Sequence, residues 1–292
     1  MELTGGQTAV VTGAGSGIGL ALAHAFAARG LNVVMADVQT DALDAAAAAV
    51  SERGVEVVAQ RTDVSRADDV NALAAAAIER FGAIHVACNN AGVASKGDAW
   101  MGPIAHWDWV MGVNFWGVVH GIRAFLPHLL ASGGHIVNTA SIAGLLPGLE
   151  PAYTASKHAV VGLTEDLYQQ MKMAGFNLGV SVLCPGWVKT GIYDADRNWP
   201  AELGEKPVGL LSGTVGAFVE RAIAEGTTPA AIADAVVSAI EAGRYWVLPH
   251  PEFTAVAIKR WESIAEGLDP QVFPMPGMPD ADEVRRSLGL EG

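Results

Sequence analysis

The sequence predicts an α/β fold, in which a doubly wound sheet of seven parallel strands carries helices on both faces. Short runs rich in valine and isoleucine recur along the chain, and they are apolar on both faces, as strands buried in a parallel sheet are. Between them lie alanine- and leucine-rich segments of helical length. Two examples, residues 41–54 and 67–82, each end in glycine, which is a common helix stop.

Seven segments have the composition of strands. They are residues 8–13, 31–37, 55–60, 84–89, 134–141, 179–186 and 244–250. No linker rich in proline, glycine or serine divides the 292 residues, so we expect one catalytic domain over residues 1–250. Residues 188–228 depart from the alternation of strand and helix. We expect residues 251–292 to form a helix and tail that pack on the same domain.

The composition excludes several classes of partner. A net charge of −13 disfavours nucleic acid and anionic membranes, because both bind basic surfaces. Histidine and cysteine show no cluster with the spacing of metal ligands, so we expect no metal site. The N-terminus lacks the pattern of a signal peptide, and no apolar run has the length of a membrane span. With two cysteines in the chain, a reducing cytoplasm is the expected compartment.

A glycine-rich turn follows the first expected strand and opens a helix. In this stretch, "TGAGSGIG" at residues 12–19, Gly13 permits a tight turn, and Gly17 permits close approach of a ligand to the backbone. Gly19 lets the helix pack against the strand. The free N–H groups and positive dipole end of the helix then suit a pyrophosphate. Its position between strand and helix predicts a dinucleotide site.

Asp37 indicates which dinucleotide is bound. It ends the second expected strand, 18 residues after Gly19, where a carboxylate accepts hydrogen bonds from the adenosine ribose hydroxyls. The same carboxylate repels a 2′-phosphate, and the residues that follow it, Val38 and Gln39, are not basic. We therefore expect NAD rather than NADP as the cofactor.

Two Tyr-x-x-x-Lys pairs lie in one expected helix, Tyr153 with Lys157 and Tyr168 with Lys172. Four residues are about one helical turn, so each lysine lies beside its tyrosine. Ligands bind at the carboxyl ends of the strands in such sheets, and Ser141 ends the fifth strand. Tyr153 follows one loop later, whereas Tyr168 lies roughly 22 Å further along the helix. The first pair is therefore the candidate for chemistry.

Taken in order, these motifs resemble those of the short-chain dehydrogenase/reductase family in its single-domain form. The residues that carry the resemblance are Thr12, Gly13, Gly17, Gly19, Asn89 to Gly92, Asn114, Ser141, Tyr153, Lys157, Pro185, Gly186 and Thr190. The resemblance implies a Rossmann-type fold and hydride transfer between a nicotinamide cofactor and an alcohol or ketone.

The resemblance also implies the role of each catalytic residue. Tyr153 serves as the base in alcohol oxidation and as the acid in ketone reduction, and Lys157 favours its phenolate. Ser141 holds the substrate oxygen, and Asn114 positions a water that links Lys157 to solvent. The segment from Ser141 to Tyr153 is one residue shorter than is usual in the family. Thr139 has the same side-chain parity as Ser141 and is the alternative to it.

Cofactor and substrate contacts follow from the same resemblance. The expected cofactor contacts are Gly13, Ser16, Gly17, Ile18, Gly19, Asp37, Asp63, Val64, Asn90, Ala91, Gly92, Tyr153, Lys157, Pro185, Gly186, Val188 and Thr190. We expect residues 188–228 to form a lid over the substrate. The expected substrate contacts are Trp100, Trp187, Tyr193 and Trp199. This aromatic set, with a weaker similarity of residues 112–130 and 245–252 to one subgroup, favours bulky hydrophobic secondary alcohols or ketones.

Further expectations concern assembly and alternative functions. Apolar residues on more than one face of the expected helices 103–131 and 152–174 favour a homotetramer or homodimer. An NADPH-dependent reductase of ketones or acyl thioesters is the second enzyme hypothesis, and Asp37 argues against it. A cofactor-binding regulator without catalysis is the third hypothesis. The complete set of Asn114, Ser141, Tyr153 and Lys157 argues against that one.

Overall fold

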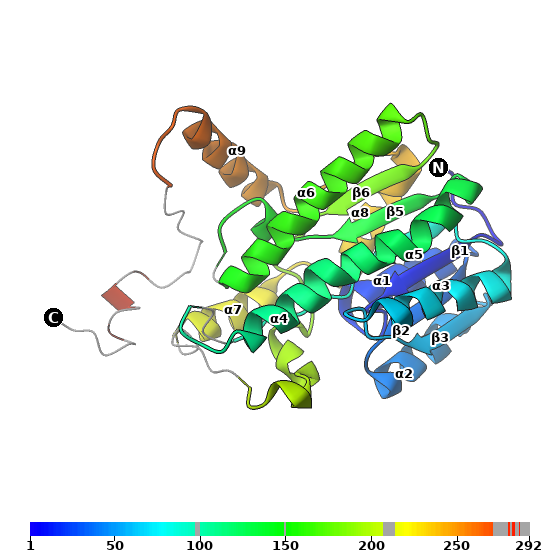
Figure 1. Ribbon diagram of the computed structural model, residues 1–292, viewed down its shortest axis with the longest axis horizontal. Helices are drawn as coiled ribbons and strands as arrows, with labels where there is room; N and C mark the ends of the chain where they lie inside the picture. The colour runs from blue at the N-terminus through cyan, green and yellow to red at the C-terminus, as the bar shows by residue number, and fades with distance from the viewer. Residues whose placement is uncertain are drawn as a thin grey trace.

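All seven expected strands form a single parallel sheet. The computed structural model describes residues 1–96, 100–148, 150–206, 214–270, 280, 282–283 and 286. The strands are β1 (Thr8–Thr12), β2 (Asn32–Asp37), β3 (Val57–Arg61), β4 (Val86–Asn89), β5 (His135–Thr139), β6 (Gly179–Leu183) and β7 (Trp246–Val247). Their order is β3-β2-β1-β4-β5-β6-β7, and each neighbouring pair is parallel (Figure 1). The predicted Rossmann-type fold is confirmed.

Helices cover both faces of the sheet (Figure 1). The α-helices are α1 (Gly17–Ala27), α2 (Thr40–Ser51), α3 (Ala67–Phe81), α4 (Ala105–Met111), α5 (Gly117–Ser132), α6 (Pro151–Met173), α7 (Thr214–Glu225), α8 (Pro229–Ala242) and α9 (Pro251–Ala265). The short helices are η1 (Gly112–Trp116), η2 (Ile142–Gly144), η3 (Ile192–Asn198) and η4 (Ala201–Leu203). Helices α3, α5 and α6 pack on one face, and α1, α2 and α8 pack on the other.

Strand β1 shows why the strands lack an alternating apolar pattern. All five of its residues are buried. Val11 belongs to the apolar cluster that includes Phe26 of α1, whereas Val10 belongs to the opposite cluster with Phe125 of α5. Successive side chains point to opposite faces of a strand, so a sheet covered on both faces needs apolar residues at every position.

All seven strands are shorter than the sequence predicts, and three of them differ most. Strand β5 ends at Thr139 and β6 at Leu183, whereas the expected segments reach residues 141 and 186, and β7 has two residues instead of seven. Beyond Thr139 the chain turns into η2, and beyond Leu183 it turns toward the lid segment. These turns carry Ser141 and Pro185 out of the sheet and over its carboxyl edge. The overestimated ends of β5 and β6 therefore fall where the strand ends become the walls of the cleft.

A π-helical turn interrupts the long helix that crosses this edge. Helix α4 continues through η1, a π-helix of five residues, directly into α5 without a break in helical geometry. Asn114 lies in the middle of η1 and is fully buried. A π-turn widens the helix locally and redirects a side chain, and such turns concentrate at functional sites. The insertion aims Asn114 at the loop that follows β4.

The expected lid and tail are described in part. Residues 207–213 of the lid, and residues 271–279 with most of 281–292 of the tail, lie outside the described residues. Helix α9 contacts the body through its first turns, where Ala257 is buried, and Trp261 is 57% exposed. Figure 1 shows α9 extending away from the sheet. The division into a catalytic domain and a packed tail stays a prediction.

The close approach of α5 to β4 gives a stability prediction. An added Cβ at Gly121 would overlap the side chain of Asn89, whose Nδ2 donates to Asn138 Oδ1 at 2.8 Å. We expect Gly121→Ala to lower the free energy of unfolding by about 1–3 kcal/mol, as overpacking does. Gly162→Ala, in the middle of α6 with open space around it, should raise it by roughly 0.5–1 kcal/mol. Urea unfolding measures both, and equal effects would contradict the assigned packing.

Candidate active site

Ser141 and Tyr153 approach each other across the loop that leaves β5. Ser141 begins η2, where its Oγ accepts a hydrogen bond from Ala143 N at 3.1 Å and donates to Pro185 O at 3.4 Å. Tyr153 lies in the first turn of α6 and is half-buried. Burial raises the pKa of Tyr153, a hydrogen bond with Ser141 lowers it, and Glu150 raises it. The bond with Ser141 favours this serine over Thr139 as the partner of the tyrosine.

Lys157 lies one turn after Tyr153 and is almost completely buried. Its Nζ donates to Thr139 O at 3.0 Å and lies 5.4 Å from the centre of the Tyr153 ring. Burial lowers the pKa of Lys157 to about 8, so the ammonium form still predominates at neutral pH. The sequence argument expected this lysine to favour the phenolate. In the chain alone, burial raises the pKa of Tyr153 instead, because desolvation penalises the phenolate.

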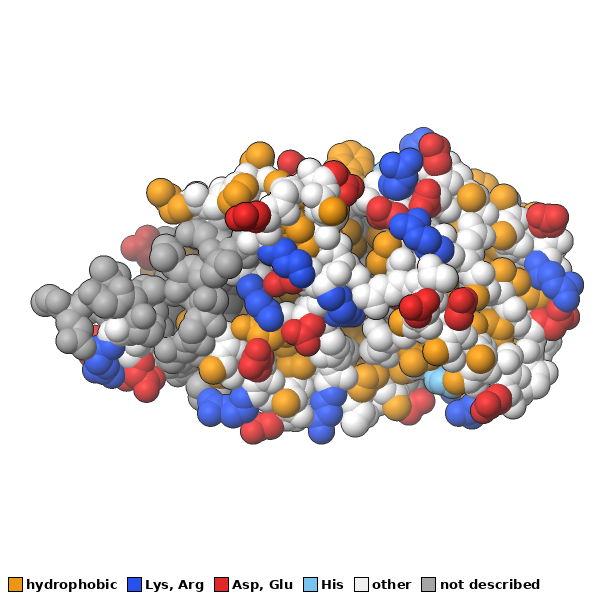
Figure 2. All heavy atoms as spheres, turned by 90° about the horizontal axis from the view of Figure 1, so that it is seen from below, with side chains coloured by type: hydrophobic (Ala, Val, Ile, Leu, Met, Phe, Trp, Pro, Cys, Tyr) orange, Lys and Arg blue, Asp and Glu red, His pale blue; other side chains and the backbone are white. Residues whose placement is uncertain are grey.

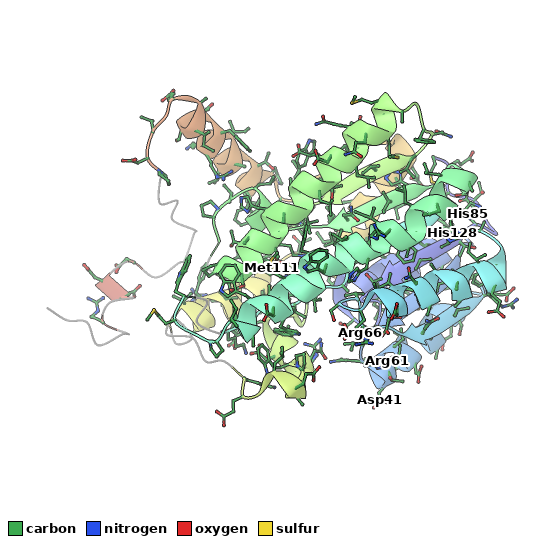
Figure 3. The ribbon with its side chains drawn as sticks, in the orientation of Figure 1. Asp41, Arg61, Arg66, His85, Met111 and His128 are labelled. Carbon is green, nitrogen blue, oxygen red and sulfur yellow. The ribbon has the colours of Figure 1, made fainter. Side chains whose placement is uncertain are left out.

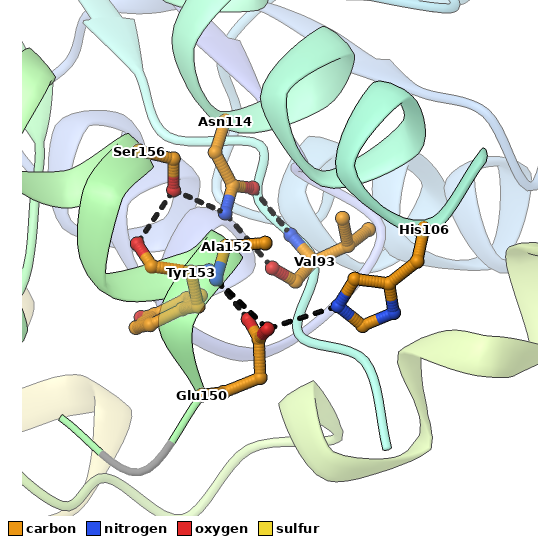
Figure 4. A network of polar contacts seen from close by, with 7 residues as sticks. All are labelled: Val93, His106, Asn114, Glu150, Ala152, Tyr153 and Ser156. Carbon is orange, nitrogen blue, oxygen red and sulfur yellow. Dashed lines mark hydrogen bonds and ion pairs between the residues drawn. The ribbon is translucent and has the colours of Figure 1, made fainter. Parts of the chain in front are cut away.

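Asn114 joins the cleft from η1. Its Nδ2 donates to Val93 O at 2.9 Å and to Ser156 Oγ at 3.1 Å, and its Oδ1 accepts from Val93 N at 2.8 Å. Figure 4 shows these bonds beside the first turn of α6. An added Cβ at Gly92 would lie 3.4 Å from Asn114 Oδ1 and 3.5 Å from Lys157 Nζ. Glycine at this position therefore leaves the approach to both groups open.

The glycine loop has the shape that a dinucleotide needs. Gly13 and Gly17 have positive φ, at 66° and 54°. A Cβ at Gly13 would lie 2.9 Å from Ala91 Cα, and one at Gly19 would overlap the carbonyl of Gly13. Within the described part of the chain, the side chain of Ser16 makes no cap bond to the start of α1. The free N–H groups there fit a pyrophosphate, so the residues present suit the expected cofactor.

Asp37 is anchored next to this loop. Its Oδ2 accepts from Gly15 N and its Oδ1 from Gln39 N, both at 3.0 Å. Strand pairing also places Arg61 of β3 in register with Asp37, and Figure 3 labels Arg61 near α2. The sequence argument considered only the residues next to Asp37 in the chain. It therefore missed the basic residue that strand pairing puts opposite Asp37.

The remaining expected cofactor residues lie along the same edge. Thr12 Oγ1 accepts from Asn90 N at 2.9 Å and from Ala91 N at 3.0 Å. A Cβ at Gly17 would lie 3.1 Å from Thr190 Cγ2, so the chain after β6 reaches the glycine loop. The other members lie in the first turn of α1, in the loop after β3 and in the chain after β6: Ile18, Asp63, Val64, Pro185, Gly186 and Val188.

The four expected substrate residues lie in four different surroundings. Trp199 is buried edge-on against Trp109, with ring centres 5.1 Å apart, and Trp187 packs against Phe218. Tyr193 lines a groove of about 980 Å³ between α1, α7 and α8, and Trp100 is 77% exposed. Their role in one substrate pocket stays a prediction.

The second tyrosine–lysine pair lies near the other end of α6. The ring of Tyr168 packs against Tyr245 at 4.9 Å, and Lys172 Nζ lies 5.6 Å from its centre. This tyrosine is therefore a packing residue between α6 and the segment before β7.

Two residues that the sequence argument missed lie next to Tyr153. Glu150 begins α6 by accepting hydrogen bonds from Ala152 N at 3.0 Å and from Tyr153 N. His106 of α4 is fully buried, and its Nε2 lies 2.9 Å from Glu150 Oε1 (Figure 4). An acidic residue before a proline is a helix-start signal that would have indicated Glu150. Nothing in the spacing indicates His106.

The two cysteines and the histidines form no further site. Cys88 and Cys184 are free and buried, and burial raises the pKa of the Cys184 thiol to about 12. Both thiols are therefore apolar packing groups at neutral pH. Across the described residues, histidine, cysteine and carboxylate side chains form no group of three that would hold a metal ion.

Comparison with known proteins identifies the family. The family model described as short chain dehydrogenase matches residues 7–201. A short chain dehydrogenase/reductase from Burkholderia phymatum, solved in complex with NAD, superposes with a TM-score of 0.89 at 41% identity. That similarity covers 94% of this chain and 100% of the other.

Two curated relatives agree. The CLA biosynthesis dehydrogenase/reductase of Lactiplantibacillus plantarum is 32% identical, over 92% of this chain and 96% of that protein. The 1-deoxy-11-beta-hydroxypentalenate dehydrogenase of Streptomyces exfoliatus is 43% identical, over 63% of this chain and 68% of that protein. The family match covers most of the chain and contains the Ser141, Tyr153 and Lys157 cluster, and the chain belongs to the short-chain dehydrogenase/reductase family of oxidoreductases.

Proposed function

We propose that the protein is an NAD-dependent dehydrogenase that transfers hydride between NAD and a bulky hydrophobic secondary alcohol or its ketone. The observation that carries this proposal is the convergence of Ser141, Tyr153 and Lys157 at the carboxyl edge of β5, beside a glycine loop shaped for a dinucleotide. A proton-transfer group next to a nicotinamide site is what oxidation of an alcohol requires.

In the proposed mechanism each side chain has one task. Tyr153 takes the hydroxyl proton in the oxidation direction and returns it in reduction. Ser141 holds the substrate oxygen beside the phenol, and Lys157 holds the nicotinamide ribose while its charge supports the phenolate. The bound nicotinamide supplies the hydride acceptor, and Asn114 keeps the first turn of α6 in contact with the loop after β4.

Asp37 supports NAD as the cofactor. Its carboxylate, fixed by two backbone N–H groups, lies where the adenosine ribose binds in this fold and repels a 2′-phosphate. The Burkholderia phymatum structure contains NAD. Among the described residues, Arg61 lies in register with Asp37 and favours NADP, whereas Asp37 directly contacts the glycine loop and favours NAD.

The substrate class is supported by the aromatic residues of the lid and by the relatives. Tyr193 lies in η3, and Trp199 is the residue directly after η3. Trp187 lies in the chain between β6 and η3. Aromatic and aliphatic walls suit a bulky hydrophobic substrate. The Streptomyces exfoliatus relative is, by its name, a dehydrogenase of a hydroxylated substrate. The natural alcohol and its stereochemistry are matters for a substrate panel.

The surface, the helices and the cysteines of the protein support the expected partners, assembly and compartment. Figure 2 shows acidic, basic and apolar side chains interspersed on the face seen from below, which does not suit nucleic acid. Along the described residues, no helix is long and apolar enough to cross a bilayer. Trp116, on the outer side of the η1 turn, is 51% exposed and supports a homotetramer or homodimer. Cys88 and Cys184 are free, buried thiols, which favours a reducing cytoplasm as the compartment.

Exchange of each tyrosine separates the two tyrosine–lysine pairs. Tyr153→Phe removes the hydroxyl that transfers the proton, and we expect turnover of secondary alcohols to fall at least about a hundredfold while NADH binding is retained. Tyr168→Phe keeps the ring that packs on Tyr245 and should leave turnover nearly unchanged. NADH fluorescence titration and initial rates measure both. A comparable loss in the two variants would overturn the assignment of Tyr153.

Cofactor preference tests the role of Asp37. A panel of aryl, terpene and steroid secondary alcohols should turn over faster with NAD than with NADP. Asp37→Ser removes the repulsion of a 2′-phosphate and should lower the NAD:NADP ratio of kcat/KM by about tenfold or more, equivalent to about 1.4 kcal/mol. Asp41→Ser, an exposed carboxylate at the start of α2, is the matched control and should leave the ratio unchanged. Faster turnover with NADP in the unaltered chain contradicts the proposal.

A further inference from the structure

The backbone of Tyr153 is held at both of its polar groups. Its N–H donates to the carboxylate of Glu150, and its carbonyl accepts from Ser156 Oγ at 2.7 Å. Ser156 in turn accepts from Asn114 Nδ2. The first turn of α6 is therefore fixed from two directions, by Asn114 on one side and by Glu150 on the other (Figure 4).

Glu150 does more than cap the helix. Pro151 occupies the first position of α6 and has no N–H, so the next free donors are those of Ala152 and Tyr153, and Glu150 satisfies both. One carboxylate thus fixes the entry of the helix directly beside the reacting phenol. Eleven residues separate Ser141 from Tyr153, and Glu150 is the last of them before the first turn of α6 begins at Pro151.

His106 fixes the orientation of Glu150. The residue is 0% exposed, and its Nε2 lies 2.9 Å from Glu150 Oε1. A carboxylate oxygen that already accepts backbone N–H bonds only accepts, so Nε2 carries the hydrogen and donates it. Within the described structure Nδ1 of this ring is buried without a partner.

The charges around the pair come from several elements. Burial is the main cause that raises the pKa of Tyr153, the hydrogen bond with Ser141 opposes it, and the charge of Glu150 raises it further. Lys157 lies beside the ring. On the side of the lid, burial raises the pKa of Asp196, and Lys96, Lys206 and His106 lower it. Asp194 lies near the same group.

We propose that His106 and Glu150 form a positioning pair for Tyr153. His106 orients the carboxylate, and the carboxylate fixes the first turn of α6 through the backbone N–H groups of Ala152 and Tyr153. Its negative charge also disfavours the Tyr153 phenolate. The inference rests on the proposed function, in which Tyr153 transfers the proton. The charge of Glu150 disfavours the phenolate form of Tyr153. Once a bound cation or a higher pH has ionised Tyr153, the same charge makes the phenolate a stronger base.

The first test measures the charge effect without any substrate. The tyrosinate absorbance of each protein is titrated with pH, and the curve of the matching Tyr153→Phe protein is subtracted. Glu150→Gln keeps an oxygen for the cap and removes the charge, so the pKa of Tyr153 should shift to a lower value. Glu165→Gln removes one charge elsewhere on α6 and should leave the curve unchanged. An unshifted curve in Glu150→Gln would overturn the electrostatic part of the proposal.

The second test separates positioning from general stability. His106→Gln keeps an N–H donor for Glu150, whereas His106→Leu removes it. We expect His106→Leu to lower kcat roughly tenfold to a hundredfold, with the KM for NAD nearly unchanged, and His106→Gln to stay within about threefold of the unaltered chain. Equal kcat in the two variants would contradict the proposal. If His106→Leu does not fold, a tenfold loss in the folded His106→Gln protein contradicts it as well.

The two tests also distinguish this inference from the proposed function. A chain that oxidises none of the alcohols in the panel would overturn the proposed function. The absorbance titration would still decide whether Glu150 acts on Tyr153.

Discussion

The site depends on the parallel register that brings Thr12, Asn90 and Thr139 to one edge of the sheet. Thr12 Oγ1 accepts from Asn90 N, and Thr139 Oγ1 donates to Asn90 Oδ1 at 3.4 Å. The carbonyl of Thr139 then accepts from Lys157 Nζ. A continuous row of polar contacts thus joins the end of β1, the loop after β4 and Lys157. Because the first two contacts cross between neighbouring strands and the third joins β5 to α6, a shift of register would separate the glycine loop from Lys157.

Burial is the second constraint, and it works against the chemistry as well as for it. The same apolar surroundings that bury Lys157 and half-bury Tyr153 disfavour the charged form of both side chains. A cleft of this kind holds a neutral phenol until positive charge arrives, and the proposed cofactor brings that charge in its oxidised form. The negative charge of Glu150 disfavours the Tyr153 phenolate further. The residue that caps α6 therefore also affects when Tyr153 can take a proton.

The sequence predicted the fold, and it indicated residues that the structure brings together at the carboxyl edge of the sheet, because both depend on local signals. Valine-rich runs, glycine stops and the Tyr153–Lys157 spacing are each visible in a few consecutive letters. Arg61 and His106 were missed because strand pairing and helix packing bring them in from remote parts of the chain. The depressed acidity of Tyr153 was missed for a related reason, since desolvation is a property of the packed interior. The strand ends were overestimated where the chain turns into the cleft.

The most direct test follows the hydrogen that leaves the carbinol carbon of the substrate. A secondary alcohol of the panel that carries deuterium on its carbinol carbon is oxidised by the protein in ordinary water, and the reduced cofactor is analysed by mass spectrometry. The account predicts one deuterium in each NADH formed, because hydride moves directly from the carbinol carbon while Tyr153 takes only the hydroxyl proton. Ketone formation with NADH that contains no deuterium would contradict direct transfer, and with it the role assigned to the cleft.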